Sequence, residues 1–254
     1  MLTNNEIKYY SSLLQKKFRQ QEKKFIFEGL KIVEEGLNSD FKCEVVLLTH
    51  AFVESNHEIL SSLSKKKIRA EVLKEEQFRK LSDTESPQGI AAVFNFFKPD
   101  YSSDKILKEN LIIYLDNISD PGNLGTIIRT ADWFGVKIIL LSPDCVELYN
   151  PKVIRASMGS IFHLDIIEDF RIPKLKSLSE KFKIILTDTF GKNLYEVNFP
   201  ENKILVFSNE GNGPSLEIQE IAYERITIPK YGNAESLNVA SAAAVVLSQI
   251  LGTN

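Results

Sequence analysis

Three stretches of the chain combine glycines with polar or charged residues at spacings that suit binding and chemistry. The first contains Asp-Pro-Gly-Asn-Leu-Gly-Thr-Ile-Ile-Arg, which places Asn123 six residues before Arg129. Pro121 and Gly122 predict a turn, and Asn123 is well placed to cap the helix that follows. An arginine inside an otherwise apolar helix is costly to bury without a partner, so Arg129 indicates contact with an anion. The alternative is an arginine on the exposed face of a helix.

The second stretch runs from Ile204 to Ser215, where an apolar strand leads into Ser-Asn-Glu-Gly-Asn-Gly-Pro. It delivers Glu210 into a loop bracketed by glycines, and such a loop lets backbone amides approach a ligand closely. Taken alone, this stretch also fits a plain strand-to-helix turn with Pro214 at the first helical position.

The third stretch is the loop from Ile228 to Asn238 together with the helix that it feeds. Proline, glycine, asparagine and serine make the loop irregular and rich in hydrogen-bonding groups. From Val239 onward nearly every residue is small or apolar, which predicts a helix surrounded by protein, with the polar loop held against the core. Ser236 and Asn238 have the simpler alternative role of capping this helix.

Composition limits the kinds of chemistry that these stretches could perform. The 254 residues are 43% hydrophobic and 26% charged, without a signal-peptide pattern or an apolar run long enough to cross a membrane, so we expect a cytoplasmic protein. The two cysteines, Cys43 and Cys145, lie far apart, and the three histidines form no ligand cluster. We therefore expect neither a disulfide framework nor a metal site.

The elements that must position these stretches alternate between helix and strand, in two parts. Residues 1–98 read as a smaller α/β domain that begins with a basic helix at 4–24 and has a largely parallel sheet. Residues 99–254 follow the polar, proline-containing linker that begins at Lys98, and repeat the alternation with more apolar strands, a pattern typical of a doubly wound parallel sheet. Ligands in such sheets gather at the carboxyl ends of the strands. The site is therefore predicted in the loops that follow Leu115, Leu186, Phe207 and Ile228.

Charge is unevenly distributed between these two parts. The net charge is −3, with 16 Lys and Arg against 14 Asp and Glu in residues 1–98 and 15 against 20 in residues 99–254. Two basic clusters stand out, and their members are Lys16, Lys17, Arg19, Lys23 and Lys24, then Lys65, Lys66, Lys67 and Arg69. On charge alone, solvated helix faces and a footprint for an anionic polymer are about equally consistent with them.

Taken together, Asn-x-Gly-x-x-x-Arg, Asn-Glu-Gly-x-Gly and Ile-Pro-x-x-Gly-x-x-Glu-Ser-Leu-Asn-Val-Ala resemble, in order and spacing, the SpoU family of RNA ribose 2′-O-methyltransferases in the SPOUT superfamily. The resemblance covers about residues 111–251. Upstream, Phe-Glu-Gly-Leu-Lys and Ser-Pro-Gln-Gly-Ile are similar to the substrate-binding domain that often precedes it. We call the three stretches the first, second and third motif.

The resemblance implies a trefoil knot at the C-terminus, S-adenosylmethionine bound in that knot, and a homodimer with active-site residues that reach across the interface. The implied site residues are Asn123 and Arg129 from the first motif, Glu210 from the second, and Ser236 and Asn238 from the third. Implied cofactor contacts are Ser208, Gly211, Ile228 and Leu237. Family members usually have glycine at the position of Ser208, and a serine would be strained there if the backbone needs a positive φ.

The leading hypothesis is therefore an S-adenosylmethionine-dependent 2′-O-methyltransferase that needs no metal and acts on structured RNA. Ribosomal RNA is favoured over transfer RNA because of the extra N-terminal domain. The alternatives are a tRNA 2′-O-methyltransferase, or an RNA-binding assembly factor on the same fold that has lost catalysis, a reading supported by Ser208. A dinucleotide-dependent dehydrogenase is a distant alternative, because the dinucleotide fingerprint is absent from the sequence.

Overall fold

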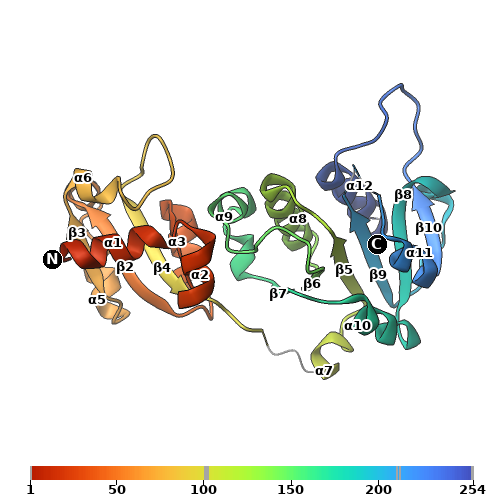
Figure 1. Cartoon of the computed structure of the whole chain (residues 1–254), viewed down its shortest axis with the longest axis horizontal. Coiled ribbons are helices and arrows are strands. Elements are labelled where there is room, and N and C mark those ends of the chain that lie inside the picture. The colour runs from red at the N-terminus through yellow and green to blue at the C-terminus, as the bar shows by residue number, and fades with distance from the viewer. Residues whose placement is uncertain (1, 100–102, 210, 212, 253–254) are drawn as a thin grey trace. The chain divides into compact units, whose positions relative to one another are not determined.

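The computed structural model describes residues 2–99, 103–209, 211 and 213–252. The chain folds into two compact units (Figure 1). The first unit contains Met1–Lys98 and Tyr149–Phe162, and the second contains Pro99–Leu148 and His163–Asn254. Among the described residues, no helix is long and apolar enough to span a membrane.

The first unit is a mixed four-stranded sheet with helices on both faces, and its strand order is β1-β4-β2-β3. Its elements are α1 (Asn4–Ser12), α2 (Lys16–Glu22), β1 (Lys24–Glu28), α3 (Leu30–Leu37), β2 (Cys43–Thr49), α4 (His50–Ser55), α5 (Ile59–Lys65), β3 (Ala70–Leu73), α6 (Glu75–Phe78), β4 (Ile90–Asn95), α9 (Pro151–Ser157) and η1 (Ser160–Phe162). Strand β4 lies between β1 and β2 and is antiparallel to both, and β2 and β3 are the parallel pair. The expectation of a largely parallel sheet is therefore wrong for this unit, because β4 inserts between two earlier strands.

The basic N-terminal helix is also broken, into α1 and α2. A capping box of Thr3 and Glu6 starts α1, and the backbone leaves the helix near Leu13. Arg19 is only 2% exposed, and its Nη1 donates to the carbonyl oxygens of Leu13 and Leu14 at 2.9 and 2.7 Å. These bonds satisfy carbonyl groups that the end of α1 leaves without helical partners. Arg19 thus stabilises the break and is not part of a basic surface.

An aromatic cluster on one face of the first sheet includes side chains from the later segment 149–162. Tyr149 stacks on Phe25, with ring centroids 4.5 Å apart, and Phe162 lies 5.6 Å from Phe27. A Cβ atom on Gly36 of α3 would lie 3.0 Å from the Phe162 ring, so glycine is what allows this close approach. The first unit therefore completes its core with residues that follow β6 of the second unit in sequence.

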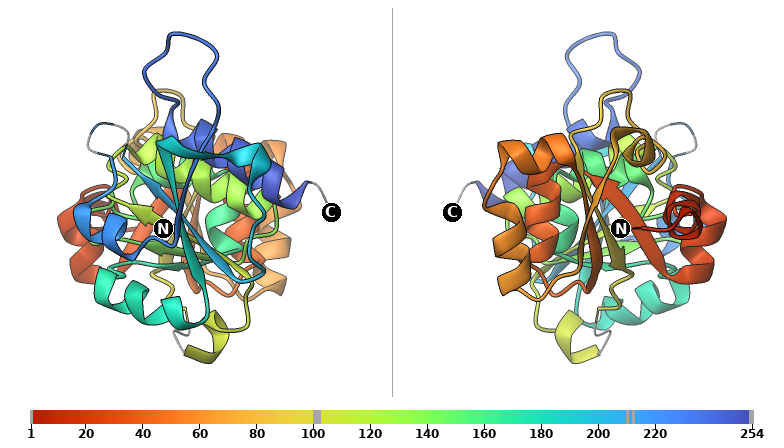
Figure 2. Two further views of the ribbon diagram at one scale, coloured as in Figure 1. Left: turned by 90° about the vertical axis from the view of Figure 1, so that its right-hand side faces the viewer. Right: turned by 90° about the vertical axis from the view of Figure 1, so that its left-hand side faces the viewer.

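The second unit is an all-parallel six-stranded sheet in the order β10-β8-β9-β5-β6-β7, with helices on both faces (Figures 1 and 2). Its elements are α7 (Ser103–Ile106), β5 (Leu111–Asp116), α8 (Pro121–Trp133), β6 (Ile138–Leu141), β7 (Asp165–Ile167), α10 (Ile172–Ser177), η2 (Leu178–Glu180), β8 (Lys183–Asn193), η3 (Leu194–Glu196), β9 (Lys203–Ser208), α11 (Leu216–Ile221), β10 (Glu224–Thr227) and α12 (Val239–Leu251). This architecture confirms the predicted doubly wound parallel sheet. The sheet continues beyond the predicted strands, with β7 and β10 at its edges.

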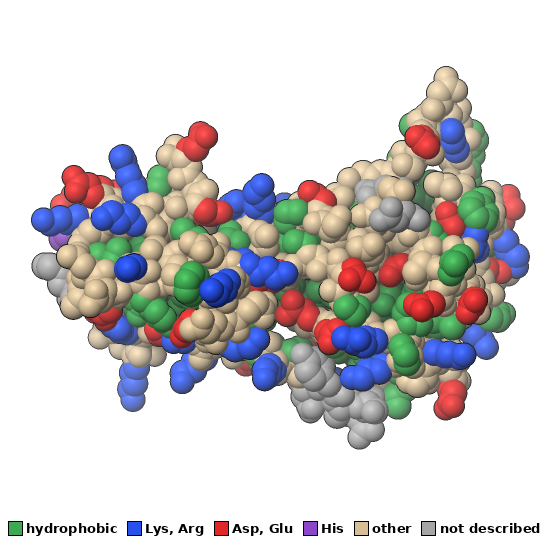
Figure 3. Space-filling model, in the orientation of Figure 1, with side chains coloured by type: hydrophobic (Ala, Val, Ile, Leu, Met, Phe, Trp, Pro, Cys, Tyr) green, Lys and Arg blue, Asp and Glu red, His purple; other side chains and the backbone are tan. Residues whose placement is uncertain are grey.

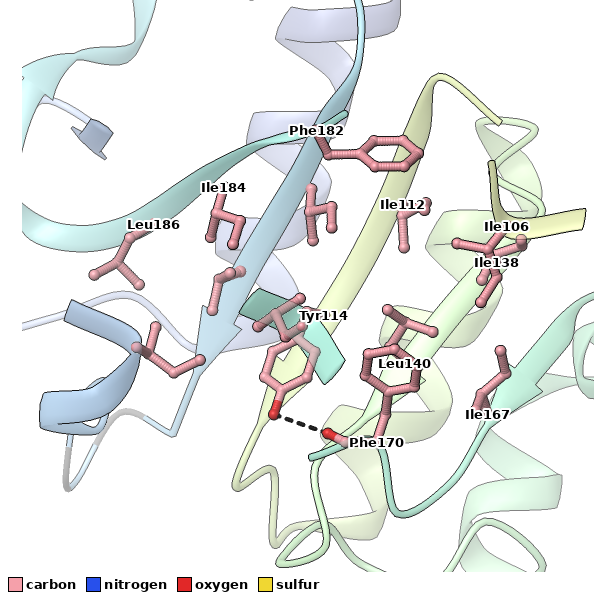
Figure 4. Close-up of a cluster of buried hydrophobic side chains, with 14 residues drawn as sticks. Ile106, Ile112, Tyr114, Ile138, Leu140, Ile167, Phe170, Phe182, Ile184 and Leu186 are labelled. Carbon is pink, nitrogen blue, oxygen red and sulfur yellow. Dashed lines mark hydrogen bonds between the residues drawn. The ribbon is translucent and has the colours of Figure 1, made fainter. Parts of the chain in front are cut away.

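Alternate residues of each strand separate the two faces of this sheet. One face carries a buried apolar cluster that includes Tyr114, Leu140 and Ile184 and is covered by Leu175 of α10 and Ile218 of α11 (Figure 4). The Tyr114 hydroxyl is buried there and donates to the Phe170 carbonyl at 3.2 Å. On the other face, α12 packs against α8 and β9. This second packing brings the first motif, on α8, next to the helix that follows the third motif.

Candidate active site

A cavity of about 300 Å³ lies at the carboxyl ends of β9 and β10 and beside the middle of β8 in the second unit. The residues that line it are Thr187, Asp188, Thr189, Ser208, Asn209, Gly213, Pro214, Ile226, Thr227, Ile228, Pro229, Lys230, Tyr231, Gly232, Ala234, Glu235, Ser236, Leu237, Val239, Ala242 and Val246. Two of the four predicted loops, those after Phe207 and Ile228, therefore contribute to one cavity. The loop predicted after Leu186 is wrong as a loop, because β8 continues to Asn193, although its residues 187–189 do line the cavity. The walls combine aliphatic side chains with a few polar groups, as small-molecule sites do.

Four of the predicted site residues line this cavity: Ser208, Ile228, Ser236 and Leu237. Ser208 ends β9, and its φ is not among the positive values found in the described part of the chain. The strain considered for a serine at this position is thus absent. Its hydroxyl instead lies 3.5 Å from Oδ2 of Asp116, which ends the neighbouring strand β5.

The loop of the second motif is held by its own polar groups. Asn209 accepts from the Gly211 amide through Oδ1 at 2.8 Å, and its Nδ2 donates to Ser119 at 3.1 Å. Gly211, a predicted cofactor contact, does not line the cavity. Glu210 lies outside the described residues, so its proposed role stays a prediction.

The loop of the third motif extends away from the sheet between β10 and α12 (Figures 1 and 2). Residues 230–238 are all exposed, and Tyr231 reaches 94% exposure. The prediction that this loop is held against the core is wrong for the single chain, because these residues make few contacts that would bury them. Loop residues line one side of the cavity and leave their outer side to solvent.

Asn238 joins the first and third motifs. Its Oδ1 accepts from the amides of Ala240 and Ser241 at 2.9 and 3.3 Å, which makes it the N-cap of α12. Its Nδ2 donates to Oδ1 of Asn123 at 2.8 Å. The expected capping role of Asn238 is therefore confirmed, and the same side chain also binds the N-terminal turn of α8.

Asn123 has a different place in its helix from the predicted one. The N-cap of α8 is Asp120, whose Oδ1 accepts from the Asn123 amide at 2.7 Å, and Pro121 occupies the first helical position. Asn123 lies in the first turn, because the helix begins before the glycine that was read as part of a turn. This position directs its side chain to Asn238.

Arg129 lies on the exposed side of α8, two turns after Asn123, and does not line the cavity. Within the described part of the chain its side chain has neither an ion pair nor a hydrogen bond. Thr126 and Trp133 are exposed on the same helix, and Trp133 reaches 84% exposure. A large aromatic side chain and an unpaired cation on one exposed stripe indicate a surface that meets another molecule.

The final helix α12 is buried on one side only. Val239, Ala243 and Leu247 are buried, whereas Ser241 and Ser248 are exposed. The prediction that this helix is surrounded by protein therefore holds for one face within the single chain and fails for the other. The uncovered face carries these two serines beside the half-buried Ala244 and Val245.

The amino-acid sequence matches the SpoU rRNA methylase family over residues 110–248, which contain all three motifs. The chain belongs to this family. Residues 4–92 match the MRM3-like substrate binding domain. The predicted family and the predicted domain type of the N-terminal part are both confirmed.

The SpoU assignment is consistent along almost the whole chain. The chain is 32% identical to 23S rRNA (guanosine(2553)-2′-O)-methyltransferase RlmP of Bacillus subtilis, with 98% of this chain and 97% of RlmP covered. A solved structure of a TrmH-family protein from Porphyromonas gingivalis has a TM-score of 0.86 and 32% identity, with 100% of both chains covered. The AdoMet-bound rRNA methyltransferase of Sinorhizobium meliloti has a TM-score of 0.84 and 25% identity, with 98% of this chain and 95% of that chain covered.

Two features of this SpoU chain were missed from its sequence. The first is the wall formed by Thr187, Asp188 and Thr189, where β8 continues past its apolar core to Asn193. The second is Asp116, whose buried carboxylate lies 3.5 Å from the hydroxyl of the cavity residue Ser208. A strand that ends in an acid before a polar loop is the signal that could have indicated Asp116.

In the first unit, the structure brings the two upstream family stretches together. Gln88 Oε1 accepts from the Leu30 amide at 3.3 Å, and Thr84 donates a short hydrogen bond to Glu28. The basic clusters divide into paired and unpaired members. Lys24 pairs with Glu44, and Arg69 pairs with Glu6 and Glu71.

Of the other exposed lysines in these clusters, Lys23 donates to Gln20 and Lys66 donates to Asn38. This leaves Lys16 and Lys17 on α2, and Lys65 and Lys67 at the end of α5. No ion pair of these four amines is found in the described part of the structure. Figure 3 shows many lysine and arginine side chains on the visible face of the first unit. These four lysines are therefore the best candidates for contact with an anionic polymer.

Proposed function

We propose that this protein methylates the 2′-hydroxyl of a ribose in ribosomal RNA, with S-adenosylmethionine as the methyl donor. Membership of the SpoU rRNA methylase family gives the reaction class. The single observation that carries the site is the cavity formed by the second and third motifs at the carboxyl edge of the sheet. The name of the similar RlmP, a 23S rRNA 2′-O-methyltransferase, supports ribosomal RNA over transfer RNA as substrate.

The residues of the cavity fit S-adenosylmethionine. Ile226, Ile228 and Leu237 provide aliphatic walls for a purine, and Thr187 provides a hydroxyl group beside backbone amides and carbonyls. When bound, the cofactor supplies an electrophilic methyl group on a sulfonium. The protein must then hold the ribose oxygen in line with that methyl, about 3 to 3.5 Å away, and help its proton to leave.

We assign to Arg129 the binding of RNA phosphate and the stabilisation of negative charge. A guanidinium is a poor proton acceptor, so Arg129 does not serve as the base. It instead holds an RNA phosphate through its planar fork and stabilises the negative charge that develops on the ribose oxygen. The proton leaves through a phosphate oxygen or water.

We further propose that the protein works as a homodimer. Arg129 does not line the cavity of its own chain, and it shares an exposed stripe of α8 with Trp133. The uncovered face of α12 lies on the helical layer that includes α8. A twofold interface over this layer would cover these residues and would bring Arg129 of one subunit to the cavity of the other.

The C-terminal trefoil knot stays a prediction that this proposal includes. The alternative of an inactive assembly factor rested on backbone strain at Ser208, and the backbone there has no positive φ. That observation therefore no longer favours the alternative.

Two measurements test the proposed function. Calorimetry in the presence of a chelator should show binding of S-adenosylmethionine, because the cavity offers no metal-ligand cluster among the described residues. Mapping of 2′-O-methylation in ribosomal RNA from cells with and without this protein should then reveal one position that loses its methyl group. Absence of cofactor binding at millimolar concentration would contradict the assignment of the cavity, and unchanged maps would contradict the substrate.

A further inference from the structure

A buried carboxylate lies directly behind the wall of the cavity, at the end of β5. Asp116 is only 6% exposed and pairs in parallel register with Ser208, the last residue of β9. No cation pairs with it among the described residues. A buried charge without a counter-ion is costly, so its contacts are the place to look for its role.

These contacts reach both ends of the loop that carries the second motif. At the start of the loop, the Asp116 carbonyl oxygen accepts from the Asn209 amide at 3.2 Å, and Oδ2 lies 3.5 Å from the Ser208 hydroxyl. At the end of the loop, the same Oδ2 accepts from the Ser215 amide at 3.2 Å. One residue of β5 therefore binds the first and the last residues of the loop from Ser208 to Ser215.

The loop held in this way forms one side of the cavity. Ser208, Asn209, Gly213 and Pro214 all line it, and the Gly213 amide donates to the Asn209 carbonyl at 2.9 Å. Displacement of either end would move these backbone groups together, because this internal bond joins the middle of the loop to its start. Asp116 does not line the cavity itself, so its effect on a bound molecule must pass through the loop.

We propose that Asp116 is a positioning residue for the cofactor: its carboxylate accepts hydrogen bonds from Ser208 and Ser215 and thereby fixes the loop that forms one wall of the cavity. The Ser208 hydroxyl is the donor that a glycine at this position lacks, so this chain has a bond between β5 and β9 that depends on its serine. This inference rests on the proposed function for the identity of the ligand, and on the structure alone for the positioning of the loop.

The test compares three variants of the full-length protein with wild type. Asp116→Ala removes both acceptors of the carboxylate, and we expect the dissociation constant for S-adenosylmethionine to rise on the order of 10-fold while kcat at saturating cofactor changes less than about 3-fold. Asp116→Asn keeps an acceptor oxygen and should restore affinity to within about 3-fold of wild type. Asp144→Ala, which removes an exposed carboxylate whose charge acts on Asp116, is the matched control and should leave affinity unchanged.

Hydrogen exchange of the Gly213 and Ser215 amides provides a readout that does not depend on the cofactor. Both amides donate hydrogen bonds in the structure, and they should exchange faster in Asp116→Ala and return to wild-type protection in Asp116→Asn. If Asp116→Ala fails to fold, Ser208→Ala removes one donor from the other side and should weaken cofactor binding about 3-fold.

Wild-type affinity and wild-type exchange in Asp116→Ala would overturn the proposal. Equal losses in Asp116→Asn and Asp116→Ala would also overturn it, because the charge rather than the acceptor would then matter. If wild-type protein does not bind S-adenosylmethionine at all, the proposed function fails, and the exchange data still decide whether Asp116 holds the loop.

Discussion

The side-chain amide of Asn238 donates to Oδ1 of Asn123 across 2.8 Å, which joins two motifs that lie 115 residues apart in the chain. The same Asn238 caps α12, so one side chain fixes both the start of the final helix and its position against α8. An ionised aspartate at position 238 could cap α12 but would have no donor for Asn123, whereas asparagine has both a donor and an acceptor.

Asn238→Ala should therefore cost more stability than Asn123→Ala. The first change removes an N-cap, at about 1 kcal/mol, together with the bond between the motifs. The second removes the bond between the motifs, about 0.5 to 1.5 kcal/mol, and leaves the Asp120 cap of α8 intact. Urea unfolding of the single and double variants would measure this, and strictly additive losses would contradict a direct coupling.

Arg129→Ala should abolish most turnover without affecting the fold or cofactor affinity, because Arg129 is exposed and does not line the cavity. Loss of one preorganised electrostatic contact typically costs on the order of 100-fold to 1,000-fold in rate. Arg129→Lys should recover little, since a point charge lacks the planar fork that grips two phosphate oxygens. Single-turnover methylation with tritiated cofactor is the measurement.

A mixed-dimer assay asks in addition whether Arg129 acts across the interface. We would co-express Arg129→Ala with a second variant whose cavity is blocked. In the mixed dimer, the open cavity of the Arg129→Ala subunit faces an intact Arg129 of its partner, so part of the activity that each homodimer lacks should return. Near-normal turnover of Arg129→Ala would instead leave Arg129 as an ordinary surface residue.

Trp133→Ala should weaken the proposed dimer, because the side chain is 84% exposed on the α8 stripe and aromatic residues contribute strongly to interface cores. Sedimentation should shift toward a monomer of 28.8 kDa at micromolar concentration. Leu216→Ala is a suitable control, because Leu216 is also exposed but begins α11, which covers the opposite face of the sheet. A wild-type protein that is already monomeric would refute the interface.

Reversing the charges of Lys16, Lys17, Lys65 and Lys67 should weaken RNA binding and flatten its salt dependence, by about one unit of slope for each phosphate that is no longer neutralised. Cofactor affinity should not change, since these residues belong to the first unit. Lys174→Glu with Lys176→Glu, on the exposed side of α10, provides a control for charge alone. If the control lowers RNA affinity as much as the four lysine reversals do, the basic clusters are ordinary solvent-exposed helix faces.

The stability of wild type relative to Asp116→Asn should depend on pH. Burial raises the pKa of Asp116 above its ordinary value of 3.8, and the nearby carboxylate of Asp144 acts in the same direction. The native state therefore retains the proton to higher pH than the unfolded chain does. The stabilising contribution is complete below 3.8 and is lost as pH rises through the raised pKa.

Unfolding free energies measured from about pH 4 to about pH 7 should thus fall for wild type relative to Asp116→Asn. A difference that stays constant over this range would show that Asp116 is not perturbed by burial.

Sequence patterns predicted the second unit well, because its apolar strands and glycine-rich loops have local signals. The patterns failed to predict exact helix starts and the burial of individual segments, which depend on the packing of the folded chain. Asp120 and Asn123 are both good N-caps, and only the start of the helix at Pro121 decides between them. The exposed loop at Tyr231 and the half-covered α12 could not be predicted because burial depends on what packs against them.

The first unit shows the same limit in its sheet. Strand β4 carries the apolar run expected of a strand, but its direction depends on where the chain returns to the sheet, for which the sequence has no local signal. Arg19 lies in a run of basic residues and is nevertheless buried, because carbonyl groups at the end of α1 bind its guanidinium.

The aromatic contacts of Tyr149 and Phe162 also limit when the first unit can fold during translation. The N-terminal unit would expose Phe25 and Phe27 until residue 162 has left the ribosome, even though residues 1–98 emerge first. A nascent chain that stops at residue 98 should therefore bind chaperones more strongly than one that extends past residue 162. Synthesis of the second unit up to Leu148 therefore has to precede completion of the first unit.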